Sequence, residues 1–109
     1  MQAFYSEPDH RGYSIEELKV GMTAFFSRAI TDADVVSFSQ LSGDTNPVHL
    51  DERYAATTPF NGRIVHGFLS ASLISAAIAL QLPGPGSIYL SQNLAFKAPV
   101  RIGCFGFSV

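Results

Sequence analysis

The chain has 109 residues, of which 47% are hydrophobic and 15% charged, with a formal net charge of −2. This length accommodates one domain, and the composition predicts a packed core and excludes intrinsic disorder. The slightly acidic balance argues against nucleic-acid and membrane-surface partners, since both favour clusters of basic residues. The single cysteine, Cys104, cannot form an intrachain disulfide, and the first ten residues lack the pattern of a secretory signal. We therefore expect a cytoplasmic protein.

The N-terminal region predicts a tail followed by a strand. Residues 1–13 are polar, contain Pro8 and Gly12 and show no periodicity, so we expect them to form a flexible tail. Residues 14–109 are expected to form a single domain, in which no internal repeat is visible. Its first strand is predicted over Met22–Ala29.

The next segment predicts a short helix. Thr31 can cap its start, and Asp34, three residues later, can return the hydrogen bond, which is the pattern of a capping box. Apolar residues follow at near-helical spacing: Val35, Phe38 and Leu41. Gly43 suits a left-handed stop. We expect an amphipathic helix over Asp32–Ser42.

A long connection and a long helix follow. Residues 43–64 form a loop of the kind that often carries function, with one helical turn expected near Glu52–Ala56. Val65–Gln81 is apolar on almost every side, with small residues interleaved. The surrounding apolar stretch, Ile64–Leu82, is about long enough to span a bilayer, but its polar side chains favour a buried core helix. Four of its side chains should then be nearly inaccessible: Leu69, Leu73, Ala76 and Leu80.

The C-terminal part predicts strands. Ser87–Phe96 alternates between apolar and polar residues with period two, which is typical of a strand, and Cys104–Val109 resembles the opening of another. The order of elements indicates the α+β class, with an antiparallel sheet packed on one helix.

One segment concentrates acids, an amide and an imidazole: Asp44-Thr45-Asn46-Pro47-Val48-His49-Leu50-Asp51. A rigid bend at Pro47 would bring the Asp44 carboxylate and the His49 imidazole towards a common point, where they could hold a water and transfer protons. The spacing leaves an alternative open, in which Asp44 closes an Asx-turn and His49 is an ordinary loop histidine. Neither a calcium loop nor a usual zinc ligand set fits, so no metal is expected.

A second candidate site lies where the long helix begins. Helix N-termini present unpaired N–H groups, and Gly67 would let a ligand carbonyl approach its amide, as an oxyanion hole requires. A need for close packing would explain the glycine at position 67 equally well. His66 is expected to be neutral and structural, because a cation is unfavourable at a helix N-terminus. Ser75 lies two turns further along the helix, and considered alone it is expected to be a small core residue.

In this order the segments resemble the MaoC-like family and, within it, the (R)-specific enoyl-CoA hydratases. The central match is the Asp-x-Asn-Pro-x-His core in Ser42–Asp51, followed by Ile64-Val65-His66-Gly67. Other matching stretches are residues 55–60, 82–90 and 94–100.

The resemblance implies a hot-dog fold, in which an antiparallel sheet wraps a long central helix, and a homodimer that binds an acyl-CoA thioester. The implied reaction is the reversible addition of water to a trans-2-enoyl-CoA, giving the (R)-3-hydroxyacyl-CoA. Asp44 and His49 would form the acid–base pair, and the Gly67 amide would polarise the thioester carbonyl. Supporting or substrate-binding roles fall to Ser75, Asn46 and His66. No cofactor is needed, because the thioester itself accepts the electrons.

The likeness fades after Gly103, where family members continue with further strands, so we expect C-terminal strands of the sheet to be missing. Two other functions stay open. One is a 3-hydroxyacyl-thioester dehydratase that acts on carrier-protein substrates, and the other is a catalytically silent module for dimerisation or acyl-CoA binding.

Overall fold

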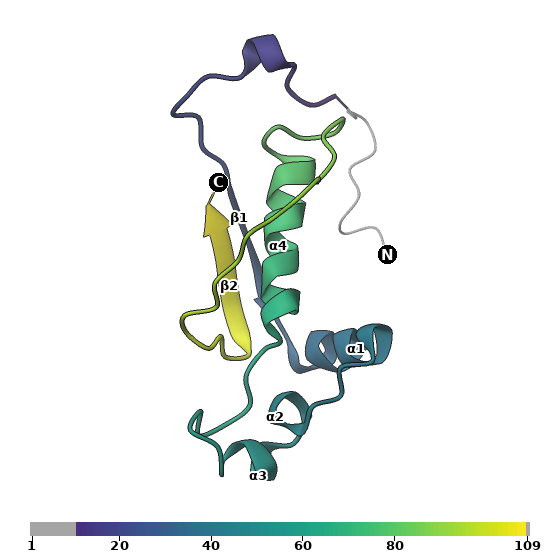
Figure 1. Cartoon of the computed structure of the whole chain (residues 1–109), viewed down its shortest axis with the longest axis vertical. Coiled ribbons are helices and arrows are strands. Elements are labelled where there is room, and N and C mark those ends of the chain that lie inside the picture. Colours follow the sequence, from purple (N-terminus) through teal and green to yellow (C-terminus); the bar gives the residue numbers. More distant parts are fainter. Residues whose placement is uncertain (1–10, 109) are drawn as a thin grey trace.

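The computed structural model describes residues 11–108, with the backbone alone for residues 104–108. Its elements in chain order are η1 (Ile15–Glu17), β1 (Phe25–Ile30), α1 (Asp32–Ser42), α2 (Pro47–Leu50), α3 (Glu52–Ala55), α4 (Gly67–Leu80) and β2 (Gly103–Ser108). Figure 1 shows α4 beside β1 and β2, with the other α-helices gathered at the end where α4 begins. The expected α+β arrangement, a sheet against one long helix, is confirmed.

Helix α1 has the predicted bounds and caps. The Thr31 hydroxyl accepts the Asp34 N–H at 3.2 Å, and the Asp34 carboxylate accepts the Thr31 N–H at 2.9 Å. Gly43 follows with a φ of 83°, the left-handed conformation that suits glycine. The predicted apolar face is only partly right. Val35 is buried, but Leu41 is 86% exposed and Ser39 takes the inner position instead.

The two strands pair antiparallel, from Phe25 opposite Ser108 to Ile30 opposite Gly103. The strand predicted from Cys104 is therefore confirmed. The first strand begins three residues later than the predicted Met22, and it ends at Ile30, whose side chain is 2% exposed and belongs to the core.

Helix α4 supplies Leu73 to a small core with Ile30, Val35 and Val65. The expected burial is right for Leu73, which is 6% exposed, and wrong for Leu80, which is 56% exposed. Leu69 and Ala76 are half-buried. Within residues 11–108 the sheet has two strands, and it covers only part of the helix surface.

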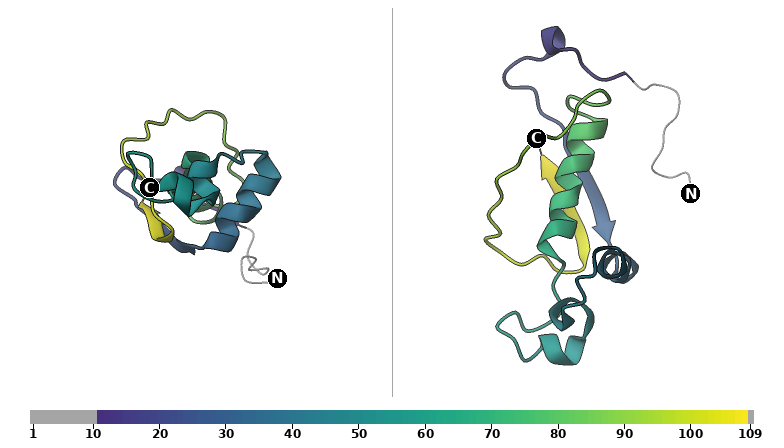
Figure 2. Two further views of the ribbon diagram at one scale, coloured as in Figure 1. Left: turned by 90° about the horizontal axis from the view of Figure 1, so that it is seen from below. Right: turned by 45° about the vertical axis from the view of Figure 1, so that its right-hand side comes forward.

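The strand predicted over Ser87–Phe96 is wrong, since none of these described residues lies in a strand. Period-two alternation favours an extended backbone, but a strand also needs a hydrogen-bonded partner. Within the described residues β1 pairs with β2 instead, and the side chains of Ile88 and Leu90 are 81% and 92% exposed. Figure 2 shows the segment returning as a loop from the end of α4 to the start of β2.

The expected tail, residues 1–13, lies mostly outside the described residues. Its last residue contacts the turn after α4, where the Tyr13 N–H donates to the Pro83 carbonyl at 2.7 Å. Among the described residues no helix is long and apolar enough to cross a membrane.

Candidate active site

The turn that carries Asp44 follows α1 directly and is held by local hydrogen bonds. The Asp44 carboxylate accepts the Asn46 N–H at 3.3 Å, and the Asn46 side chain accepts the Val48 N–H at 3.1 Å. Asn46 is thus the N-cap of α2, and Pro47 occupies its first position, where a missing N–H costs nothing. The expected rigid bend is a single helical turn, which directs His49 back towards Asp44.

His49 is held at one ring nitrogen and at its backbone carbonyl. Its side chain is buried, with the residue 8% exposed, and Nδ1 lies 2.9 Å from the Ile64 carbonyl oxygen. A carbonyl only accepts, so Nδ1 carries the hydrogen and Nε2 of the neutral ring is an acceptor. The His49 carbonyl in turn accepts from Arg63 Nε at 2.7 Å, and Arg63 pairs with Asp32 at 2.6 Å.

Asp44, His49 and His66 meet at one place. Each offers a ligand atom, and these three atoms lie within 4.8 Å of one another. Asp44 is exposed whereas both histidines are buried, so the carboxylate opens to solvent and the imidazoles form the inner wall. The approach of Asp44 and His49 agrees with the sequence interpretation, and their catalytic role stays a prediction.

His66 is the N-cap of α4 and is 2% exposed. Its ring stacks on that of His49, with centroids 3.8 Å apart and an interplanar angle of 26°. Burial lowers the pKa of His66 below its ordinary value, and the neighbouring His49 acts in the same direction, while the Asp44 carbonyl and carboxylate oppose the shift. His66 is therefore neutral at pH 7, as the helix N-terminus also favours.

The three groups are poorly arranged for a metal ion. Imidazole lone pairs lie in the ring plane, and a zinc ion would have to sit in both planes about 2.0–2.1 Å from each nitrogen. Two stacked rings with centroids 3.8 Å apart and an interplanar angle of 26° hold their lone pairs in two separate, roughly parallel planes. The stacking of His49 and His66 thus disfavours coordination of one ion by both rings.

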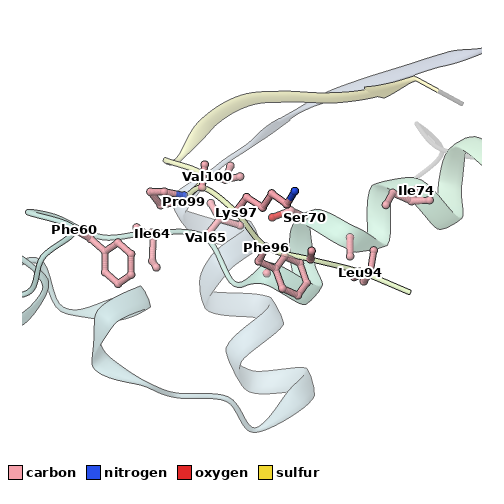
Figure 3. Close-up of a pocket in the computed structure, with 14 residues that line it drawn as sticks. Phe60, Ile64, Val65, Ser70, Ile74, Leu94, Phe96, Lys97, Pro99 and Val100 are labelled. Carbon is pink, nitrogen blue, oxygen red and sulfur yellow. The ribbon is translucent and has the colours of Figure 1, made fainter. Parts of the chain in front are cut away.

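Gly67 is the first residue of α4, where backbone N–H groups have no partner within the helix. It lines an elongated, mostly apolar cavity of about 550 Å³ between the start of α4 and the returning loop, shown in Figure 3. A Cβ added at Gly67 would lie 3.0 Å from the Phe96 ring. The absence of a side chain at Gly67 therefore leaves room for Phe96 as well as access to the amide.

The cavity and the Asp44–His49 pair both adjoin one short backbone segment. Ile64 lines the cavity, while its carbonyl oxygen holds His49. Gly67 lines the cavity directly after His66, which faces the pair. Residues 64–67 therefore connect an apolar cavity to the acid–base groups.

The structure places the remaining predicted residue apart from this site. Ser75 is exposed and does not line the cavity; it lies eight residues beyond Gly67, or about 12 Å along the helix. Ser70 lines the cavity instead, and its hydroxyl donates to the His66 carbonyl at 3.2 Å.

Three residues that contact the site escaped the sequence interpretation: Arg63, Phe96 and Ser39, whose hydroxyl oxygen lies 3.0 Å from Nε2 of His66. Ser39 was detectable in principle, since it stands four residues after the core residue Val35 and so shares its helix face. Arg63 and Phe96 reach the site only through tertiary contacts with residues far away in the sequence.

A long helix against an antiparallel sheet, with an Asp–His pair beside the helix N-terminus, defines the class of protein. The chain belongs to the MaoC-like family, whose domain, described as the MaoC like domain, matches residues 17–104. The R-hydratase PhaJ1 of Pseudomonas aeruginosa, in its unliganded form, superimposes with a TM-score of 0.83 at 51% identity, covering 89% of this chain and 63% of that one. The expected hot-dog fold is thereby confirmed.

Two named relatives share about half of the aligned residues with this chain. The 3-hydroxybutyryl-CoA dehydratase of Methylorubrum extorquens is 51% identical over 96 residues, and the alignment covers 88% of this chain and 61% of the relative. The (R)-specific enoyl-CoA hydratase of Rhodospirillum rubrum is 53% identical over 88 residues, and this alignment covers 81% of this chain and 61% of the relative. The chain thus spans about 61% of the length of these two relatives.

Proposed function

We propose that this protein is an (R)-specific enoyl-CoA hydratase, which adds water reversibly to a trans-2-enoyl-CoA to give the (R)-3-hydroxyacyl-CoA. The observation that carries the proposal is the convergence of the Asp44 carboxylate and the His49 imidazole within 4.8 Å, beside the N-terminus of α4. The names of relatives at 51–53% identity support the substrate class and the stereochemistry.

In this proposal Asp44 and the free Nε2 of His49 hold a water molecule between them. The water oxygen adds to C3 of the enoyl thioester, and one of its protons passes to the pair. The C2–C3 π electrons move towards the thioester, and the pair delivers a proton to C2, so one molecule of water is added overall. The neutral Nδ1–H tautomer of His49 suits this exchange, because Ile64 holds one nitrogen and leaves the other available.

The Gly67 N–H would donate a hydrogen bond to the thioester oxygen and stabilise the negative charge that develops there. A backbone N–H at a helix N-terminus is suited to this, because it is unpaired and carries partial positive charge. The apolar cavity that begins at Gly67 would receive the acyl chain. No cofactor is required in this scheme, since the enolate of the thioester is the electron sink.

The test is hydration of crotonyl-CoA by the chain, with chiral analysis of the 3-hydroxybutyryl product. Formation of the (R)-alcohol, with loss of activity in Asp44→Asn, is the expected result. An (S)-product, or full activity in the variant, would contradict the proposal.

The second candidate function uses the same chemistry on carrier-protein thioesters. It is favoured by a relative from Solanum lycopersicum, the 3-hydroxyacyl-[acyl-carrier-protein] dehydratase FERN, which is 43% identical over 86 residues. Parallel assays with crotonyl-CoA and a crotonyl carrier protein would separate the two. A chain that binds acyl-CoA without turnover would instead be a silent binding module.

We further infer a homodimer in the cytoplasm. Large apolar side chains such as Phe25 and Phe68 are 63% and 69% exposed in the single chain, which supports association through the sheet and α4. Light scattering coupled to size-exclusion chromatography tests the dimer. The CoA substrate and the lone Cys104 support the location, which imaging of a fluorescent fusion tests.

A further inference from the structure

His66 is buried and contacts both members of the pair. Its ring stacks on His49 at 3.8 Å, and the ring of Phe38 meets it edge-on at 4.8 Å. Its Nε2 lies 3.1 Å from the carbonyl oxygen of Asp44 and 3.0 Å from the hydroxyl oxygen of Ser39. One side chain thus contacts both Asp44 and His49 while being 2% exposed.

The contacts of His66 determine its tautomer. The Asp44 carbonyl can only accept, so Nε2 carries the hydrogen, which it shares with the Ser39 oxygen. Nδ1 is then a bare lone pair, and it has no hydrogen-bond partner among the described residues. Buried and neutral, His66 is arranged to hold its neighbours rather than to exchange protons.

Asp44 needs such an anchor, because its other contacts are local. Its N–H is bonded to the Ser42 hydroxyl at 3.1 Å, and its carboxylate accepts from Asn46 at 3.3 Å. Both partners belong to the same exposed turn. The bond from His66 links this turn to the N-terminus of α4, where Gly67 begins the helix.

We propose that His66 is a positioning residue, which fixes the Asp44 backbone through its Nε2–H. This inference rests on the proposed hydratase function. It assigns Ser39 a secondary role, since its hydroxyl oxygen shares the same N–H and so favours the required tautomer.

Two substitutions separate the hydrogen bond from the ring. His66→Phe keeps an aromatic ring on His49 but removes the donor, and His66→Gln can present an N–H near the same place without the ring. We expect kcat for crotonyl-CoA hydration to fall about tenfold or more in His66→Phe with KM little changed, because a misplaced group lowers the rate of a bound substrate. His66→Gln should recover most of this loss.

The matched control is Ser72→Ala, since Ser72 is exposed on the same helix and, within the described part of the chain, its hydroxyl bonds only its own turn, at the Leu69 carbonyl. It should leave kcat unchanged. Wild-type kcat in His66→Phe, or equal losses in both His66 variants with native circular dichroism, would overturn a role for the N–H.

Histidine ring ¹H–¹⁵N spectra test the tautomers of His66 and His49 without an activity measurement. The wild-type chain should show His66 as the neutral Nε2–H tautomer and His49 as the Nδ1–H tautomer. An Nδ1–H tautomer at His66 overturns the inference even if the chain is an active hydratase. A wild-type chain without activity would remove the proposed function, and the spectra alone would then decide whether His66 holds Asp44.

Discussion

The carbonyl oxygen of Ile64 accepts a hydrogen bond from Nδ1 of His49 at 2.9 Å. This contact joins residues 15 positions apart and places the hydrogen of the neutral His49 ring on Nδ1. The same backbone segment continues into the N-terminus of α4. The tautomer that the proposed proton transfer requires is therefore set by the segment that leads into Gly67.

Asp44→Asn tests the acid–base pair with little disturbance of the turn. Asparagine keeps the side-chain oxygen that accepts the Asn46 N–H, but it cannot take up a proton. We expect the hydration rate to fall by about 10²-fold or more, the lower range for a lost general base. The control is Asp51→Asn, which keeps the cap of α3 at Tyr54 and should retain activity. Similar losses in both variants would point to a folding defect instead.

Gly67→Ala tests access to the amide at the start of α4. The new methyl group would lie 3.0 Å from the Phe96 ring, but Phe96 is 59% exposed and can move. We therefore expect a small loss of stability and a loss of activity approaching about 10²-fold, as for an oxyanion-hole donor. The double variant Gly67→Ala, Phe96→Leu relieves the contact. Recovery of activity in the double variant would mean that crowding, and not access to the amide, causes the loss.

His66 makes stability depend on pH. Its pKa is lowered in the folded state from 6.5, chiefly by burial, so the unfolded chain binds more protons below that pH. The contribution of His66 to the free energy of unfolding should be fully present above pH 6.5. It should decrease as the pH falls towards the folded-state pKa, by at most about 1.4 kcal/mol per pH unit for one proton. Urea unfolding at about pH 7.5 and about pH 5.5 measures the slope. His66→Gln should reduce it, and an unchanged slope would assign the effect to other groups.

Leu73→Ala and Leu80→Ala compare two leucines on one helix. Leu73 is 6% exposed and belongs to the core, whereas Leu80 is 56% exposed. We expect Leu73→Ala to lower the free energy of unfolding by about 2–5 kcal/mol, and Leu80→Ala by less than about 1 kcal/mol. Chemical denaturation measures both. A comparable loss at Leu80 would show that this end of α4 is covered in solution, for example by a second copy of the chain.

The sequence by itself determined the features that depend on neighbouring residues. The Thr31–Asp34 capping box and Gly43 specify α1 within the chain segment that forms it, and the predicted bounds are those observed. The Asp-x-Asn-Pro-x-His pattern likewise specifies its own turn, because Asn46 caps α2 and Pro47 begins it.

Tertiary structure decided the features that require a partner far away in the sequence. The alternating segment Ser87–Phe96 carries a strand pattern, but its pairing depends on which strand lies beside it, and β1 pairs with β2. The tautomer of His49 depends on Ile64, and the enclosure of His66 depends on Ser39. Local patterns fix backbone conformation within a few residues, whereas burial, pairing and proton positions follow from contacts that form only when the chain has folded.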